Sequence, residues 1–249
     1  MKKVALIFAA LLMVLPLVVS AQVIVDDSFE GRSTGEWVQG YGEWGVRGGM
    51  LVQRDTETGL ARIDRRVPQS GEIEISFKVR YEAGGFEDQA ALRGGQLHGG
   101  FGIHVGVENP PLGRVAWGAG NSYLLWLNLD TRRSTLVDAR QHYGFRGQVY
   151  RSTNNATMDL TPYNVDITAE LQNVGITLGV NQIDQFLGVL VPMKIRVNYD
   201  TGRIMVMDPT NPSLWFYFDV EPSVLRGNYL SLRTNALAVS FADIMVTQR

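Results

Sequence analysis

Apolar and polar residues alternate along most of this chain with the period of two that is typical of β-strands. The clearest segment is Glu72–Arg80, where Ile73, Ile75, Phe77 and Val79 alternate with charged or hydroxyl-bearing residues. This pattern predicts a strand with one buried face and one face in water. Segments of similar character recur at residues 23–30, 50–54, 60–67, 101–107, 123–129, 193–199, 204–207, 214–220, 229–233 and 239–247.

Turn-forming residues separate several of these segments. Gly48-Gly49 reverses the chain into the apolar pair Met50-Leu51, and Asp200-Thr201-Gly202 joins two alternating segments. Both sites have the turn chemistry of antiparallel hairpins. Asp130–Arg133 is also predicted to form a hairpin turn, with the returning strand at Ser134–Ala139.

The alternation weakens over residues 140–188, which we interpret as a long polar excursion. Within it, Asn181 as N-cap and Gly188 as terminator predict one short helix. The chain shows no internal repeat, and its roughly twelve predicted strands follow one another at short spacing. These features predict an all-β fold, a two-sheet antiparallel β-sandwich of jelly-roll type with at most one or two short helices.

Residues 1–21 have the three zones of a secretory signal peptide. Lys2-Lys3 forms the basic zone, Val4–Val19 the apolar zone, and Ser20-Ala21 the small residues before the cleavage site. A membrane anchor is the alternative, but the apolar zone spans only ~24 Å as a helix against a hydrocarbon core of ~30 Å. We therefore expect export to the periplasm or the extracellular space, no membrane span after cleavage, and a single β-sandwich domain over residues 22–249.

Composition narrows the class of protein further. The chain has no cysteine, so an exported protein of this sequence must be stabilised by its core and not by disulfides. Without Lys2 and Lys3, 21 basic residues (23 minus 2) stand against 25 acidic residues. This mixed, slightly acidic balance argues against nucleic acid as a partner. No nucleophile elbow, phosphate-binding loop or dinucleotide fingerprint is present.

A series of short motifs spans most of the chain: Phe29-Glu30-Gly31, Trp37, Trp44-Gly45-Val46, Gly48–Leu51, the hairpin Ile195–Met207, Gly227–Leu232 and Val239–Val246. Their order resembles the concanavalin A-like lectin/glucanase superfamily, including its laminin-G-like and secreted bacterial sugar-hydrolase-like domains. This resemblance implies a curved sheet whose concave face or rim loops hold carbohydrate. The hydrolase branches carry a Glu-x-Asp-x-Glu strand, and this chain has no such run.

Four acidic residues are candidate acids if the chain acts on glycans: Glu72, Glu74, Asp130 and Asp138. Glu72 and Glu74 share one strand face with Cα atoms ~6.6 Å apart, which is superficially suited to a two-carboxylate glycosidase. However, an amphipathic strand needs charged residues on its solvated face in any case. We therefore assign no catalytic residue from the sequence.

Asp27 and Asp243 occupy positions of inward-facing residues on the two terminal strands. A buried carboxylate needs a partner, and a bound Ca²⁺ is one way to provide it. The alternative, which we favour, is a β-bulge at Ala242-Asp243 that turns the acid outward, because Ile244 is out of phase with Phe241. No other cofactor is expected, since His98, His104 and His142 lack metal-ligand spacing.

One candidate ligand-binding face emerges from the pattern. Segment 101–107 alternates apolar residues with glycines, so its side away from the core carries little besides His104. Trp126 and Asn128 lie on a predicted neighbouring strand, and Trp117 and Tyr143 lie in flanking loops. An aromatic plane edged by hydrogen-bonding groups suits a sugar, which has apolar C–H faces and a polar rim. Alternatively, Trp126 packs as ordinary core beneath the 140–188 excursion.

Three function hypotheses follow from the sequence. The first is an exported, non-catalytic β-sandwich that binds carbohydrate or another cell-envelope component. The second is a glycoside hydrolase or lyase of the same fold, and the third is a structural envelope protein that acts through protein–protein contacts.

Overall fold

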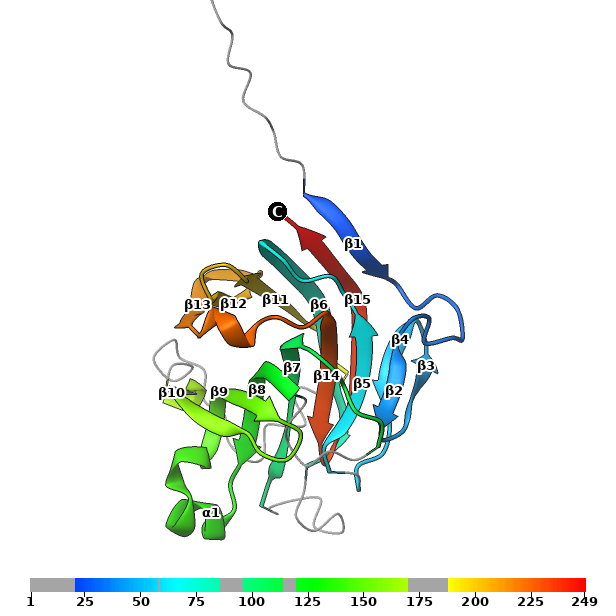
Figure 1. The fold of residues 1–249 in the computed structure, drawn as a ribbon. Coiled ribbons are helices and arrows are strands. Elements are labelled where there is room, and N and C mark those ends of the chain that lie inside the picture. Colours follow the sequence, from blue (N-terminus) through cyan, green and yellow to red (C-terminus); the bar gives the residue numbers. More distant parts are fainter. Residues whose placement is uncertain (1–20, 58, 86–95, 114–119, 170–187) are drawn as a thin grey trace, which may run out of the picture.

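The computed structural model describes residues 21–57, 59–85, 96–113, 120–169 and 188–249, without the side chains of 208 and 211–214. The chain forms two antiparallel sheets that pack face to face (Figure 1). The expected all-β, two-sheet sandwich is therefore confirmed.

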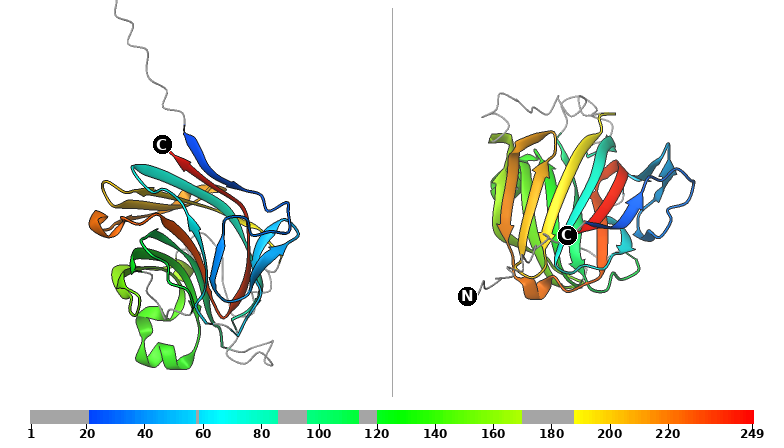
Figure 2. Two further views of the ribbon diagram at one scale, coloured as in Figure 1. Left: turned by 45° about the vertical axis from the view of Figure 1, so that its right-hand side comes forward. Right: turned by 90° about the horizontal axis from the view of Figure 1, so that it is seen from above.

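Sheet A has eight strands in the order β13–β12–β11–β6–β15–β4–β3, with β1 paired to β15. The bounds are β1 (Gln22–Asp27), β3 (Trp44–Arg47), β4 (Met50–Gln53), β6 (Glu72–Gly84), β11 (Val191–Asn198), β12 (Arg203–Asp208), β13 (Asn211–Asp219) and β15 (Leu237–Gln248). Seen from above, β11, β6, β15 and β1 run side by side across the top layer (Figure 2).

Sheet B has seven strands in the order β10–β9–β8–β7–β14–β5–β2. The bounds are β2 (Val38–Tyr41), β5 (Ala61–Arg66), β7 (His98–Val107), β8 (Gly120–Asp130), β9 (Gly144–Asn154), β10 (Asp159–Asp166) and β14 (Tyr229–Asn235). The described helices are short: α1 (Arg133–Asp138) and the 3₁₀ turns η1 (Arg140–His142) and η3 (Pro222–Val224).

The apolar side chains of both sheets meet in a single core, and Phe241 on β15 lies at its centre. Phe241 is fully buried. Its ring lies 6.3 Å from Trp44, 6.1 Å from Phe77 and 6.3 Å from Phe101, measured between ring centroids. Phe101 belongs to sheet B and the other two to sheet A, so these contacts join the two layers.

Strand β15 contains the bulge that the sequence predicted at Ala242-Asp243. The pairing of β15 with β6 shifts register between Ala242 and Met245, and Asp243 has a positive φ of 50°. Before the bulge β15 pairs with β4, and after it β15 pairs with β1. The bulge turns the Asp243 carboxylate outward to Lys78 at 2.7 Å.

Two predictions for the middle of the chain are wrong. Residues 134–139 do not form a returning strand, because α1 begins at Arg133. The Asp130 carboxylate accepts hydrogen bonds from the Arg132 backbone N–H and the Thr135 hydroxyl, both at 3.0 Å, which favours a compact turn here. Residues 140–188 are not wholly an excursion either, since β9 and β10 extend sheet B. The helix predicted at Asn181–Gly188 and the signal segment lie almost entirely outside the described residues.

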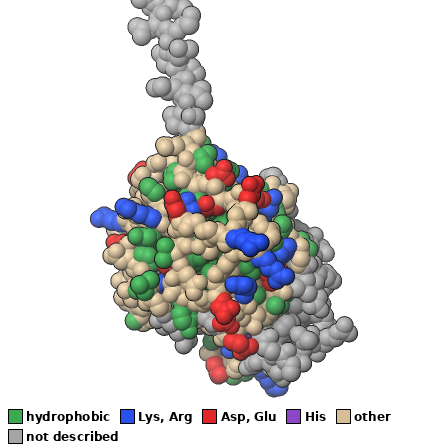
Figure 3. Space-filling view, turned by 90° about the vertical axis from the view of Figure 1, so that its right-hand side faces the viewer, with side chains coloured by type: hydrophobic (Ala, Val, Ile, Leu, Met, Phe, Trp, Pro, Cys, Tyr) green, Lys and Arg blue, Asp and Glu red, His purple; other side chains and the backbone are tan. Residues whose placement is uncertain are grey.

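The surface of the described residues shows no large block of one charge sign in the view of Figure 3, where acidic and basic side chains lie side by side. No helix within the described part of the chain is long and apolar enough to cross a membrane.

Truncation of the central ring tests this account of the core. We expect Phe241→Ala to lower the free energy of unfolding by about 3–5 kcal/mol, because it removes a fully buried aromatic ring and leaves a cavity. Met245→Ala on the same strand is the matched control, since that side chain is 39% exposed and its loss should stay within about 0.5 kcal/mol. Urea unfolding at pH 7 measures both. Equal losses in the two variants would contradict the packing described.

Candidate functional site on the outer face of sheet B

The side of sheet B that faces away from the core carries polar side chains arranged in rows. Alternate residues of a strand point to one face, and the antiparallel register aligns them across neighbouring strands. The central row crosses six strands, from β5 to β10: Arg62, Arg233, Gly102, Trp126, Gln148 and Asn164. Such a row brings distant parts of the sequence onto one surface.

Trp126 lies in the middle of this row and is buried. A Cβ atom at Gly100 would come within 2.5 Å of the indole ring, and one at Gly102 within 2.8 Å. The ring therefore packs directly on the bare backbone of β7, and Trp126 is only 4% exposed. The expected open aromatic plane is wrong in this respect, because the glycines that leave β7 bare serve to admit the indole.

His104, the other central residue of the predicted face, is completely buried on β7. Neither ring nitrogen has a hydrogen-bond partner within the described part of the chain. Burial holds the pKa of His104 well below 6.5, and the nearby charges of Arg233 and Arg62 lower it further. The imidazole is therefore neutral and lies beneath the surface.

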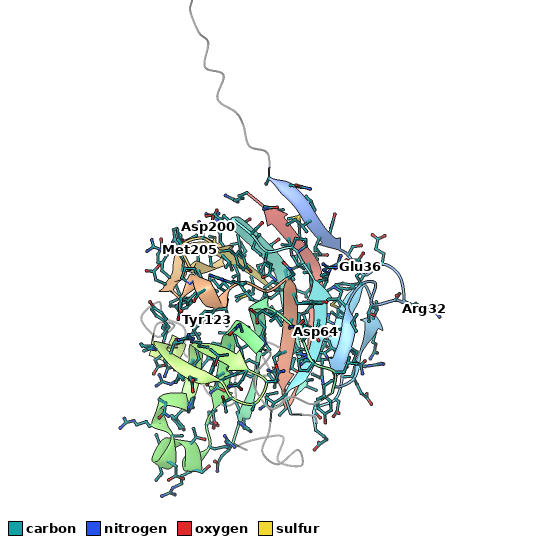
Figure 4. All side chains as sticks on the ribbon, viewed as in Figure 1. Arg32, Glu36, Asp64, Tyr123, Asp200 and Met205 are labelled. Carbon is teal, nitrogen blue, oxygen red and sulfur yellow. The ribbon has the colours of Figure 1, made fainter. Side chains whose placement is uncertain are left out.

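A buried ionic cluster occupies the β5–β14 part of the same face (Asp64 is labelled in Figure 4). The Arg62 guanidinium donates to the Asp64 carboxylate at 3.0 Å, and the Ser231 hydroxyl donates to it at 2.6 Å. Burial raises the pKa of Asp64 against the opposing effect of Arg62 and Ser231. For Arg233, burial and the charge of Arg62 lower the pKa to about 9.

Segment 109–113 lies against the neighbouring part of the outer face, which is formed by β2 and β5. The Arg62 guanidinium donates to the Pro111 carbonyl, and the Gly113 backbone N–H donates to the Gly40 carbonyl at 3.0 Å. These contacts hold the segment on the sheet. The β2–β5 part of the outer face is therefore partly covered, and Arg62 is 1% exposed.

The β8–β10 part of the face holds a short turn, residues 141–143, formed by the last two residues of η1 and the residue after it. Side chains from three strands donate to its backbone carbonyls. These bonds are Asn164 to Gln141 (2.8 Å), Gln148 to Gln141 (3.2 Å), Asn128 to His142 (2.8 Å) and Arg146 to Tyr143 (2.6 Å). We call these residues, together with Tyr150, the 141–143 site.

The His142 ring is fixed at the centre of the 141–143 site. Its Nδ1 lies 3.1 Å from the Gln148 amide nitrogen and 3.2 Å from the Tyr150 hydroxyl, and the His142 and Tyr150 rings are within 5° of parallel. Because an amide nitrogen only donates, Nδ1 accepts and the neutral ring carries its proton on Nε2. Nε2–H has no hydrogen-bond partner among the described residues, so it is a donor that a ligand can use.

Tyr150 and Gln148 complete this arrangement. The Tyr150 hydroxyl donates to the Gln148 side-chain oxygen at 3.0 Å. Burial raises the pKa of Tyr150 to about 12, so the hydroxyl keeps its proton at neutral pH. Gln148 is buried, whereas His142, Tyr143 and Tyr150 are partly exposed. The site thus presents two rings whose orientation is set by the buried Gln148 amide.

The structure brings only part of the predicted set together. Asn128 and Tyr143 belong to the 141–143 site, and Trp126 lies buried next to Asn128. His104 lies buried near Arg233 and Arg62, and Trp117 lies outside the described residues. The ligand-binding role of these residues stays a prediction. Sequence reasoning missed His142, Gln148, Tyr150 and Asn164. The signal that could have revealed a strand here was a period-two pattern within residues 140–188, in which Arg146, Gln148 and Tyr150 fall on the opposite side from Val149.

Two of the four candidate catalytic acids, Glu74 and Asp130, are held as ionised groups. Burial alone would raise the pKa of Glu74, but hydrogen bonds from Arg196 and Lys194 outweigh it and the pKa lies below its ordinary value. Asp130 behaves in the same way, because bonds from Arg132 and Thr135 outweigh its burial. Glu72 approaches Arg196 at 3.7 Å, and Asp138 is exposed at the end of α1.

The two candidate calcium ligands bind separate protein partners. The Asp27 carboxylate accepts hydrogen bonds from Arg65 and, at 2.8 Å, from the indole N–H of Trp37. Asp243 pairs with Lys78, as described above. The described residues contain no group of three or more histidine, aspartate or glutamate side chains that could hold a metal ion. Each carboxylate has a cationic side chain as its partner in this structure, and a role in calcium binding stays a prediction.

Comparison with known proteins identifies the fold. No family model matches the sequence, and no curated protein matches it. Lectin II from Ulex europaeus aligns over 89% of this chain and 95% of its own, with a TM-score of 0.51 and 12% identity. The lectin UEA-II complexed with galactose aligns over 90% of this chain and 97% of its own, with a TM-score of 0.50 and 10% identity.

The basic winged bean lectin with Tn-antigen covers 92% of this chain and 98% of its own, at a TM-score of 0.50 and 9% identity. These legume lectins are concanavalin A-like jelly-roll sandwiches. The fold that the sequence motifs resembled is therefore confirmed.

The buried histidine predicts a specific pH dependence. Because the pKa of His104 is lowered in the folded protein, the unfolded chain takes up this proton at a higher pH than the folded protein does. The free energy of unfolding should therefore fall below pH ~6.5, by up to about 1.4 kcal/mol per pH unit, and should be unaffected by His104 above it. Urea unfolding between pH 8 and 5 measures this slope, which His104→Leu should flatten. An unchanged slope in the variant would refute the assignment.

Proposed function

We propose that this chain is an exported, non-catalytic protein that binds carbohydrate through the 141–143 site on the outer face of sheet B. The observation that carries the proposal is the pair of partly exposed rings, His142 and Tyr150, held by the buried Gln148 amide. A sugar presents apolar C–H faces to aromatic rings and hydroxyl groups to donors and acceptors. This site offers both kinds of contact within one small surface.

Preorganisation supports a binding role for this site. The amides of Asn128, Gln148 and Asn164 fix the 141–143 turn before any ligand arrives. A ligand therefore does not have to order the turn, and less of its interaction energy is lost to conformational entropy. The Nε2–H of His142 and the partly exposed Tyr143 side chain complete a surface suited to a hydroxyl-rich ligand.

The electrostatics of the acids support a non-catalytic role. A glycosidase needs one carboxylic acid whose pKa is raised, so that it can protonate the leaving group near neutral pH. Glu74 and Asp130 have lowered pKa values because arginine and lysine side chains stabilise their ionised forms. Both carboxylates are therefore suited to holding structure rather than to donating a proton.

Two further points support the proposal at a coarser level. Three of the solved structures of similar fold are lectins, one complexed with galactose and one with Tn-antigen, although their identity to this chain is low. Export rests on the signal peptide predicted at residues 1–21, which directs the mature chain, from Gln22, to the periplasm or the extracellular space.

Two substitutions test the binding site. We expect His142→Ala to weaken binding at least tenfold, because it removes the donor Nε2–H and one ring face. Tyr150→Phe should weaken binding about three- to tenfold, because it removes the hydroxyl that orients Gln148 and His142. A glycan array with residues 22–249 finds the ligand, and isothermal titration calorimetry then measures the dissociation constants.

Tyr81→Phe is the matched control for these variants. Its hydroxyl also donates one hydrogen bond, to the Gly84 carbonyl at 2.8 Å, but it belongs to sheet A. This variant should bind as the parent does. Absence of binding to every glycan on the array would contradict the proposed function, and equal affinity in His142→Ala would contradict the proposed site.

A further inference from the structure

Two aromatic side chains lie exposed and side by side on the outer face of sheet A. Trp215 and Tyr217 belong to the edge strand β13 and are 40% and 52% exposed. Their ring centroids are 5.1 Å apart, and their planes are inclined by 31°. Phe216 and Phe218 take the alternate positions and pack toward the core. The strand therefore directs one aromatic pair into the interior and the other into solvent.

Two methionines continue this surface onto the next strand. Met207 pairs with Trp215 and Met205 pairs with Tyr217 in the β12–β13 register, so both methionines lie on the same outer face. Both are partly exposed. Figure 4 labels Met205 on this side of the molecule, remote from Glu36 and Arg32. We call these four residues the β12–β13 patch.

The charges around the β12–β13 patch are balanced in pairs. Arg203 makes a two-point contact with Asp219, at 2.8 and 3.0 Å. On the next strand, Lys194 and Arg196 contact Glu74 at 3.0 and 2.9 Å. Each described cation beside the rings therefore already has a carboxylate partner. The patch is electrically suited to an uncharged partner, and an anionic polymer or an anionic lipid surface would gain little there.

Strand β13 is held firmly although it is an edge strand. The Tyr163 hydroxyl of β10 donates to the Asp219 carbonyl at 3.0 Å and accepts from the Asp219 backbone N–H at 3.1 Å. The Tyr163 ring also packs edge-on against Phe218, with centroids 5.3 Å apart. These contacts join the edges of the two sheets. The exposed rings are therefore mounted on a fixed support, which lowers the entropic cost of binding.

From these features we infer that the β12–β13 patch is a second carbohydrate-binding surface, which takes a neutral polysaccharide. The faces of Trp215 and Tyr217 stack on the C–H faces of adjacent sugar rings, and the exposed Arg203–Asp219 pair meets hydroxyl groups at the rim. This inference rests on the proposed function in taking the ligand class to be carbohydrate, but it concerns a different surface.

The two surfaces lie on opposite outer faces of the sandwich, with the core between them (Figure 2). They point away from each other, so one protein molecule can hold two separate glycan chains. A monomeric chain would then cross-link a polysaccharide, because a link needs two sites that engage different polymers.

The test uses residues 22–249 and soluble neutral polysaccharides, namely galactomannan, xyloglucan and mixed-linkage glucan, with alginate as the anionic comparison. The double variant Trp215→Ala/Tyr217→Ala should lose the increase in light scattering that marks cross-linking. It should still be retarded in affinity electrophoresis through the 141–143 site. Val23→Ala is the control, since Val23 is an exposed apolar residue (53%) on the same sheet and far from β13.

Each outcome decides a separate point. Scattering unchanged in the double variant, or a preference for alginate that the double variant removes, would overturn the second surface. So would sedimentation showing that the parent self-associates through these two residues, because a second copy would then be the occupant. If His142→Ala binds normally and the double variant does not bind, the second surface stands and the 141–143 site is wrong. If the double variant matches the parent and His142→Ala does not bind, the 141–143 site stands and the second surface is wrong.

Discussion

The rest of the structure depends on one apolar layer shared by two sheets. Phe241, Trp44 and Phe77 of sheet A meet Phe101 of sheet B in that layer, and neither sheet could exclude water from its inner face alone. Because the layer takes up the inner side of most strands, their opposite sides are left for other chemistry. Without cysteine in the chain, no disulfide can substitute for this layer.

The outer face of sheet B shows how differently two halves of one surface can be used. Over β5 and β14, the buried Arg62 is paired with Asp64, and segment 109–113 lies against β2 and β5. Over β8, β9 and β10, neutral amides hold the 141–143 turn and leave ring surface partly in water. A buried charge must be paired to be tolerated, whereas an amide can satisfy its partners and still position a ligand-facing group. We therefore assign the proposed binding role to the amide half.

Alternation alone predicted the strands whose inner residues are strongly apolar, such as β6 and β11, and it also located the bulge at Asp243. It failed at β9, because Gly147 and Arg151 flank Val149 and leave the inner side of that strand weakly apolar. It failed at α1, where the Asp130 carboxylate organises a turn through local hydrogen bonds that periodicity does not register.

The candidate site was only partly predictable for a different reason. Asn128 and Tyr143 could be found because they lie near an obvious strand and its loop. The burial of Trp126 depends on Gly100 and Gly102 lying across from it, which only the register between β7 and β8 reveals. The placing of His142 depends on side chains from β8, β9 and β10, and the alternation did not reveal the last two of these strands.

The most direct test of the central claim is a crystal structure of residues 22–249 with a bound oligosaccharide. The account predicts a sugar ring within hydrogen-bonding distance of His142 Nε2 and in contact with Tyr150, while the core around Phe241 is unchanged. A sugar bound elsewhere, with the β8–β10 part of the outer face of sheet B left bare, would contradict it.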